Sequence, residues 1–146
     1  MIINIMGLAS SKIKKVAKQA AGFSLEFLNQ PCVELSIKFV SPKEIQRLNK
    51  DFRNIDKVTD VLSFPATDTQ VGEIVEQEGT YLGDMAICLK QAKKQAKEYN
   101  WKLCQEVQKL VIHSVLHLLG YDHIEDKDYQ IMNEQEQKIA EKLKGE

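Results

Sequence analysis

All three histidines of this 146-residue chain, His113, His117 and His123, fall within eleven residues in the pattern H-x3-H-x2-G-x2-H. A separation of four residues places His113 and His117 on one face of a helix, about one turn apart. Gly120 can adopt the left-handed conformation that ends a helix, and the reversal that follows allows His123 to return toward the same point. The spacing therefore predicts three imidazoles around one small cation.

Three neutral imidazoles would leave the fourth position of a tetrahedral Zn²⁺ ion to water, which is the arrangement of a catalytic rather than a structural site. None of the cysteines, Cys32, Cys88 and Cys104, has metal-ligand spacing to a histidine. The alternative is that the histidines pack on an apolar helix with a polar turn behind them. Because buried imidazoles without partners carry a desolvation cost that metal ligation removes, we favour the metal site.

The same spacing occurs in the zinc-binding helix and turn of metzincin peptidases, but one position differs. Those enzymes place a glutamate directly after the first histidine, where it acts as the general base. This chain has Ser114 at that position, and a serine hydroxyl has no useful basicity at neutral pH. A peptidase is therefore only a minor alternative.

Three blocks of the sequence, in matching order and spacing, resemble the YbeY family of bacterial metal-dependent endoribonucleases and rRNA maturation factors. The segment HSVLHLLGYDH (113–123) resembles the family signature, and LNKDFRNIDKVTDVLSFP (48–65) and LGDMAIC (82–88) resemble two further family segments. The family's M-x-x-x-E pattern after the histidines is echoed by Met132 and Glu136. The resemblance covers most of the chain from about residue 33 onward.

The resemblance implies a zincin-related α+β fold in which the three histidines bind one Zn²⁺ ion in a cleft beside the sheet. It also implies that Arg53 is the counterpart of the family's functionally important arginine in that cleft. A guanidinium suits this role because it is permanently charged and can hold two phosphodiester oxygens at once. The alternative for Arg53 is an ordinary surface ion pair with Asp51 or Asp56.

The activity implied by the resemblance is single-strand-specific, zinc-dependent hydrolysis of RNA phosphodiester bonds, in small-subunit rRNA maturation and ribosome quality control. Zn²⁺ would acidify water, while Arg53 offsets the charge that grows on the phosphorane. The general base is open: Asp122 could orient an imidazole or cap the turn, and Asp60 and Asp84 are further candidates. Implied partners are RNA, chiefly rRNA, and the small ribosomal subunit with its assembly factors, an Era-type GTPase among them.

A non-catalytic ribosome-assembly factor is the second function class, in which zinc holds the fold and the cleft only binds RNA or a ribosomal protein. The charge pattern suits both classes, because the net charge of −1 hides positive blocks of +5 before residue 58 and +4 over residues 85–109. Such blocks can create a local positive field on a nearly neutral molecule. A stripe on one expected helix is either a phosphate track or a solubilising face; it consists of Lys90, Lys93, Lys94 and Lys97.

The elements that must position these groups are short strands and amphipathic helices. From hydrophobic periodicity we expect strands at 2–6, 33–40, 59–65 and 80–89, and helices at 10–28, from 42 onward, and at 89–103, 105–119 and 126–143. Ser41 is a predicted N-cap, and Phe52 and Tyr99 are predicted to face inward. Residues 66–79 are expected to form a loop or hairpin tip. Strands come first and helices dominate the end, which predicts an α+β class with a small mixed sheet flanked by helices.

The composition predicts one globular domain over residues 1–146. Hydrophobic residues make up 43% and charged residues 28% of the chain, which excludes disordered and collagen-like classes. An odd number of widely separated cysteines indicates a reducing cytoplasm rather than a disulfide framework. No apolar stretch approaches the ~20 residues of a membrane helix. We therefore expect a cytoplasmic protein without a membrane partner.

Overall fold

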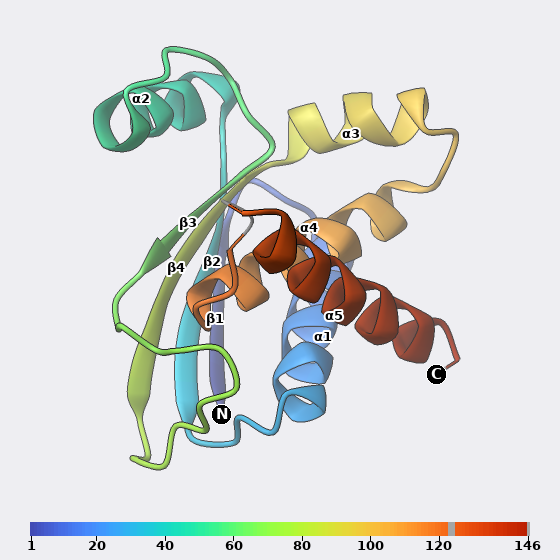
Figure 1. The fold of residues 1–146 in the computed structure, drawn as a ribbon. Helices are drawn as coiled ribbons and strands as arrows, with labels where there is room; N and C mark the ends of the chain where they lie inside the picture. The colour runs from blue at the N-terminus through green and yellow to red at the C-terminus, as the bar shows by residue number, and fades with distance from the viewer. Residues whose placement is uncertain (123–124, 146) are drawn as a thin grey trace.

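The computed structural model describes residues 1–122 and 125–145, and its centre is one mixed four-stranded sheet (Figure 1). The strands lie in the order β1-β2-β4-β3, with bounds β1 Ile2–Gly7, β2 Val33–Val40, β3 Val61–Pro65 and β4 Thr80–Cys88. Strands β1, β2 and β4 run parallel, and β3 pairs antiparallel with β4 at one edge. This small mixed sheet with its flanking helices confirms the predicted α+β class.

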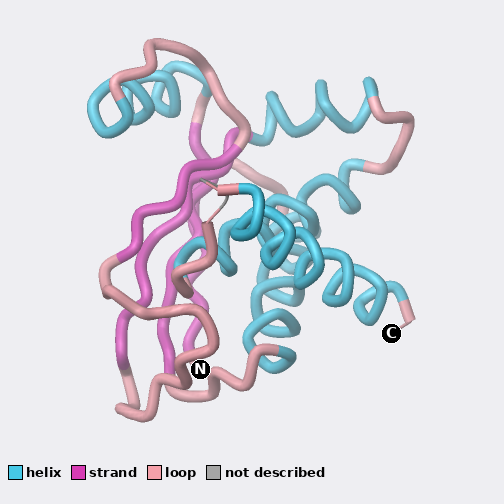
Figure 2. The backbone as a smooth tube through the Cα atoms, in the orientation of Figure 1, coloured by secondary structure: helices cyan, strands magenta, loops and turns pink. Residues whose placement is uncertain are grey.

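The helices of the described residues are α1 Ser11–Phe27, α2 Pro42–Arg53, α3 Leu89–Glu98, α4 Leu103–Leu118 and α5 Asp126–Lys144. Helices α1, α4 and α5 lie on the same side of the strands (Figure 2). Helix α4 contacts α1, α3 and α5 as well as β3 and β4, so every layer of the fold holds it in place. Within the described residues, none of these helices combines the length and hydropathy of a membrane span.

The core lies between the sheet and the helices on that side. In β2 the predicted alternation places Leu35 and Ile37 fully inside the core, while the side chain of Lys38 is exposed. From the helix side, Val111 and Val115 of α4 are completely buried against the same cluster. The histidine helix is therefore anchored by one apolar face, which leaves its other face to carry polar groups.

Serine side chains begin two of the helices. The hydroxyl of Ser10 accepts from the backbone N–H of Ile13 at 3.2 Å, and that of Ser41 accepts from the N–H of Glu44 at 3.1 Å. Pro42 occupies the first turn of α2, where its missing N–H leaves no hydrogen bond unmade. The prediction of a cap at Ser41 is confirmed, and it fixes where the helix that ends at Arg53 begins.

Two predicted inward-facing aromatic residues are in fact exposed. Helix α3 ends at Glu98, before the predicted boundary, because Asn100 adopts a left-handed conformation with φ of 56°. Tyr99 therefore lies outside the helix and is 61% exposed. Phe52 is 67% exposed, and its ring makes an edge-on contact with the ring of Phe64, with centroids 5.2 Å apart.

Residues 66–79 connect β3 to β4 without regular secondary structure, as predicted. The side chain of Gln30 ties this segment to the end of α1. Its Nε2 donates to the carbonyl of Glu73 at 2.7 Å, and its Oε1 accepts from the N–H of Val75 at 3.0 Å. The segment is thus fastened to the body of the domain, beside the turn that follows the histidine helix.

Candidate functional site

A cleft of about 760 Å³ opens between β3 and α4. Its wall includes Arg53 from the last turn of α2 and both described histidines, His113 and His117, from α4. Arg53 lies 60 positions or more before the two histidines in sequence, and tertiary packing brings all three to one opening. The structure thus places Arg53 in the same cleft as His113 and His117.

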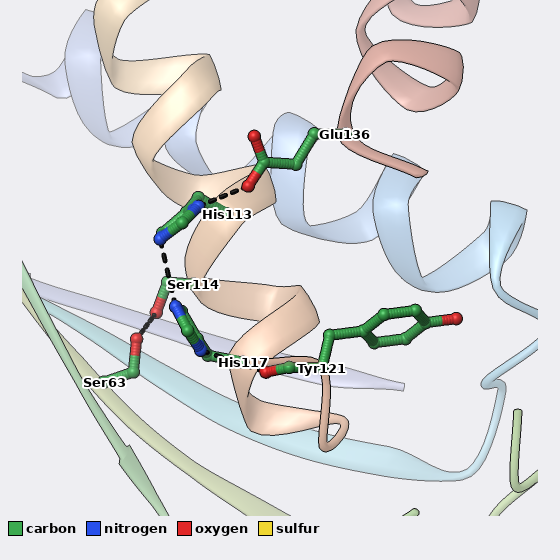
Figure 3. Close-up of polar contacts among 6 residues, drawn as sticks. All are labelled: Ser63, His113, Ser114, His117, Tyr121 and Glu136. Atoms are coloured by element: carbon green, nitrogen blue, oxygen red, sulfur yellow. Dashed lines mark hydrogen bonds and ion pairs between the residues drawn. The ribbon is translucent and has the colours of Figure 1, made fainter. Parts of the chain in front are cut away.

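The two imidazoles of α4 point at each other across one helical turn. Nε2 of His113 lies 3.0 Å from Nε2 of His117, and the ring planes are nearly perpendicular (Figure 3). The side chain of His113 is 33% exposed, so the space between the rings is reached from the cleft. The predicted i, i+4 geometry is therefore present, with both Nε2 atoms converging on one point.

The outer ring nitrogens fix how each imidazole is protonated. Nδ1 of His117 lies 3.0 Å from the carbonyl oxygen of Tyr121, which can only accept, so this Nδ1 carries the proton. Nδ1 of His113 contacts the carboxylate of Glu136 on α5, which is also an acceptor (Figure 3). In their neutral forms both rings consequently direct the lone pair of Nε2 toward the shared point.

This donor set fits a zinc ion. Two nitrogen ligands at about 2.0–2.1 Å from a tetrahedral Zn²⁺ would lie about 3.3 Å apart, close to the separation of the two Nε2 atoms. Metal-bound histidines commonly donate their second ring N–H to a carboxylate or a carbonyl, as His113 and His117 do here. His123, the third predicted ligand, lies outside the described residues. Within those residues no cluster of three His, Cys, Asp or Glu side chains is arranged for a metal ion.

The turn after α4 depends on a glycine, as the spacing predicted. Gly120 has φ of +95°, and a Cβ atom there would lie 2.2 Å from the carbonyl oxygen of Thr69. Any larger residue would therefore meet both backbone strain and the 66–79 connection. The helix proper ends at Leu118 with Leu119 as C-cap, so Gly120 is the left-handed residue after the cap rather than the cap itself.

Ser114 is not among the residues that line the cleft. It is completely buried, and its hydroxyl lies 2.7 Å from that of Ser63 on β3 (Figure 3). The position that carries the general base in metzincins therefore serves here to join α4 to the edge strand.

Arg53 projects into the cleft from the end of α2, where Asn54 closes the helix with φ of 60°. Among the described residues it forms no ion pair with Asp51 or Asp56. Asp56 instead accepts from Nε2 of Gln46 at 3.0 Å. The alternative of a surface ion pair with these aspartates is therefore wrong, and the guanidinium is available to an anion in the cleft.

The three aspartates considered as proton acceptors occupy different places. Asp60 and Asp122 line the cleft, whereas Asp84 lies on an exposed face of β4 and accepts from the hydroxyl of Tyr81 at 2.5 Å. Asp60 already accepts from the N–H of Val61 at 2.7 Å and from Nε2 of Gln95 at 3.0 Å. The geometry removes Asp84 from the candidates.

The phenols of Tyr121 and Tyr81 remain protonated at neutral pH. Burial raises the pKa of Tyr121, whose ring points away from the two imidazoles in Figure 3. Burial also raises the pKa of Tyr81, and its hydrogen bond to Asp84 adds to the shift. Tyr121 therefore contributes its backbone carbonyl to the site and no proton acceptor.

Sequence reasoning missed the parts played by two residues. Glu136 was noticed only as part of a family pattern, and the structure shows that it holds His113. Lys109 lines the cleft on the same face of α4 as the histidines. Its position four residues before His113 was a signal that could have placed it there. The lysine stripe of α3, in contrast, is exposed but contributes nothing to the described wall of the cleft.

A profile of the family described as Endoribonuclease YbeY matches residues 4–144 of this chain. Three bacterial proteins named Endoribonuclease YbeY are similar to it. That of Finegoldia magna is 45% identical over 82% of this chain and 74% of its own length. The Clostridium botulinum (strain Loch Maree) protein is 42% identical over 73% of this chain and 72% of its own length. The Caldicellulosiruptor bescii protein is 40% identical over 80% of this chain and 77% of its own length.

The fold also has a counterpart among solved structures. The solution structure of TM1509 from Thermotoga maritima matches this chain with a TM-score of 0.68 and 32% sequence identity. The match covers 98% of this chain and 89% of the other. Agreement over almost the whole length means that the sheet, the histidine helix and α5 belong to one shared arrangement.

Proposed function

The chain belongs to the Endoribonuclease YbeY family, and from that premise we propose that it is a zinc-dependent endoribonuclease that hydrolyses phosphodiester bonds of single-stranded RNA. The proposed physiological substrate is ribosomal RNA, in maturation of the small subunit and in ribosome quality control. The proposed partners are the small subunit and its assembly factors, an Era-type GTPase among them, in the cytoplasm.

One observation carries the proposal: the cleft joins a convergent imidazole pair to a guanidinium that pairs with neither neighbouring aspartate. A site for a divalent cation beside a fixed positive charge suits a substrate that is anionic at the bond to be broken. A phosphodiester meets that requirement, and a peptide bond does not.

A Zn²⁺ ion held by His113, His117 and His123 would supply Lewis acidity toward water and toward a phosphoryl oxygen. The surrounding residues of the protein fix the orientation of the His113 and His117 imidazoles. The Tyr121 carbonyl and the Glu136 carboxylate each accept an Nδ1–H and keep both Nε2 lone pairs aimed at the shared point.

Arg53 binds and orients the scissile phosphate in this proposal. Its planar fork can donate two parallel hydrogen bonds to the non-bridging oxygens, and these bonds strengthen as negative charge accumulates there. Lys109, on the same wall, adds a second positive charge, which favours entry of the RNA backbone.

Asp60 and Asp122, together with Asp68, are the carboxylates that line the described wall, and the first two are the candidates to take up a proton during hydrolysis. Asp60 already accepts hydrogen bonds from the N–H of Val61 and from Nε2 of Gln95. A comparison of Asp122→Asn with Asp60→Asn in the pH dependence of cleavage separates them.

Replacement of Arg53 tests this function most specifically. Because Arg53→Ala removes a charge-assisted contact to the transition state, cleavage of single-stranded small-subunit rRNA fragments should slow by roughly 10²–10³-fold. Bound zinc and the melting temperature should stay unchanged. The matched control is Arg47→Ala on the same helix, whose guanidinium lies 3.9 Å from Glu44 at the surface, and which should cleave like the parent protein.

Equal cleavage by Arg53→Ala and the parent protein, with zinc retained, would contradict the assigned role of Arg53. If the parent protein binds these fragments tightly and cleaves none of them, the result supports the non-catalytic assembly factor instead.

A further inference from the structure

Two aromatic rings are presented to solvent at the connection between α3 and α4. Tyr99 is 61% exposed and Trp101 is 38% exposed, and their ring centroids lie 5.5 Å apart at an interplanar angle of 56°. Figure 1 shows this connection at the outer end of α4. The left-handed Asn100 between them turns the chain out of α3 and keeps both rings off the core.

The indole of Trp101 is fixed by a buried carboxylate. Its Nε1 donates to Oε2 of Glu106 at 3.0 Å, and Glu106 is completely buried. Nε2 of Gln95 approaches the other oxygen of Glu106 at 3.5 Å and also donates to Asp60 in the cleft wall at 3.0 Å. A ring tied in this way has little freedom to lose when a ligand stacks on it.

Lys109 connects the aromatic pair to the cleft. Its Nζ lies 5.2 Å from the ring centroid of Tyr99 and 5.3 Å from that of Trp101. The same lysine lines the cleft and precedes His113 by four residues, which is about 6 Å along the axis of α4. The rings therefore adjoin the site rather than belonging to a separate surface.

The charges around the rings select the kind of ligand. A cationic ligand would be repelled by Lys109, whose ammonium lies beside both rings. Lys97 and Lys102 are exposed next to the pair, with Glu98 as the one acidic residue of this short stretch. Flat aromatic surface combined with net positive charge is the combination that binds single-stranded nucleic acid through base stacking and phosphate contacts.

We propose that Tyr99 and Trp101 form a stacking platform for a nucleobase of the single-stranded RNA, with Lys109 contacting the adjoining phosphate at the mouth of the cleft. This inference rests on the function proposed above, because it takes RNA as the ligand. The platform favours unpaired bases, since a base in a duplex offers no free face to the rings.

The single tryptophan of the chain makes the platform directly observable. Because Trp101 is the only tryptophan, its fluorescence reports on this place alone. The experiment mixes the zinc-loaded protein with an end-labelled oligoadenylate in a stopped-flow instrument. It records tryptophan emission together with the anisotropy of the label, before cleavage proceeds. Quenching of Trp101 should follow the anisotropy change at every RNA concentration.

Matched variants separate stacking from other effects. Tyr99→Ala should weaken binding about 5- to 150-fold, the measured range for loss of one base stack, whereas Tyr99→Phe should bind like the parent protein. Tyr129→Ala, which removes another exposed tyrosine on α5, is the control and should change nothing. Trp101→Phe keeps a ring while it removes the N–H donated to Glu106, so a folded Trp101→Phe protein should retain most of the affinity.

Lys109→Gln should lower the slope of log affinity against log salt by about 0.7, the value for one phosphate contact to a single strand. Lys142→Gln, whose ammonium lies 5.6 Å from the Phe27 ring, is its control. RNA binding with unchanged Trp101 emission and full affinity in Tyr99→Ala would overturn the platform and leave the endoribonuclease proposal intact. Absence of both binding and cleavage in the parent protein would overturn both.

Discussion

The sixteen residues of helix α4 form two faces with different roles, one buried and one lining the cleft. Its buried face carries Val111, Ser114 and Val115, which pack against the sheet and α1 with no exposure. Its cleft face carries His113 and His117, whose outer nitrogens are held while their inner nitrogens reach the cleft. The register between the two faces is fixed, so the packing of one determines where the other points.

Stability and chemistry are therefore separated by a rotation of about 100° around one helix axis. A change on the buried face should alter folding before it alters chemistry. A change on the cleft face should remove metal binding or cleavage and leave the fold in place.

Loss of a proposed ligand on the cleft face should abolish function without unfolding the protein. His117→Ala removes one of the three proposed ligands, so bound zinc should fall from one per chain to a small fraction, and RNA cleavage should disappear with it. Because alanine favours a helix more than histidine does, the thermal transition of the metal-free proteins should stay close together. Metal analysis and circular dichroism measure the two effects. Full retention of zinc would mean that the ligands are wrongly assigned.

A charge placed on the buried face should destabilise the fold itself. Ser114→Glu places a carboxylate where the structure offers the Ser63 hydroxyl and apolar side chains, and it should lower the free energy of unfolding by more than about 3 kcal/mol. Ser114→Ala loses only one hydrogen bond and should cost about 1 kcal/mol. Urea unfolding gives both values.

The same variant tests the minor peptidase alternative. Neither the parent protein nor Ser114→Glu should hydrolyse casein, because a general base needs a positioned substrate as well as the right place in sequence. Chelator-sensitive turnover of casein by the parent protein would contradict the reading of the cleft as a phosphodiesterase site.

The residue that holds His113 should have an intermediate effect. Glu136→Gln keeps the shape of the side chain and removes its charge, so zinc affinity should fall about 10- to 100-fold, the usual effect of losing such an outer contact. Glu134→Gln on the exposed side of the same helix is the matched control. Competition with a zinc-binding dye measures the two affinities, and equal values would show that Glu136 does not tune the metal.

The lysine face of α3 should have the smallest effect, because it lies outside the described cleft wall. If Lys90, Lys93, Lys94 and Lys97 track the RNA backbone, their joint replacement by glutamine should flatten the salt dependence of RNA binding by up to ~3 units. Zinc content should not change. An unchanged slope would assign the stripe to solubility and leave Arg53 and Lys109 as the basic groups that meet RNA.

Local sequence signals predicted much of the fold. The alternation in β2 and the Ser41-Pro42 start of α2 each depend on neighbouring residues alone, and the structure confirms both. The early end of α3 is also encoded locally, in Asn100, which adopts a left-handed conformation that ends a helix. Hydrophobic periodicity alone extends the predicted helix beyond this residue. The prediction that Tyr99 faces inward is wrong for that reason.

The arrangement of the site could be predicted only in part. The i, i+4 spacing places two imidazoles together on any helix, so the proximity of His113 and His117 follows from the sequence alone. Arg53 was linked to them only through family resemblance, because α2 and α4 approach the cleft through tertiary packing. Glu136 and His113 are 23 residues apart in sequence. Their contact depends on how α5 packs against α4, which hydrophobic periodicity does not specify.

The most direct test of the central claim is the rate of single-stranded RNA cleavage as a function of bound zinc. Metal-free protein is loaded stepwise, and zinc content and cleavage of one small-subunit rRNA fragment are measured on the same samples. The cleavage rate should rise in proportion to bound zinc and stop rising at one ion per chain. Cleavage at the full rate by the metal-free protein would contradict the proposed zinc dependence.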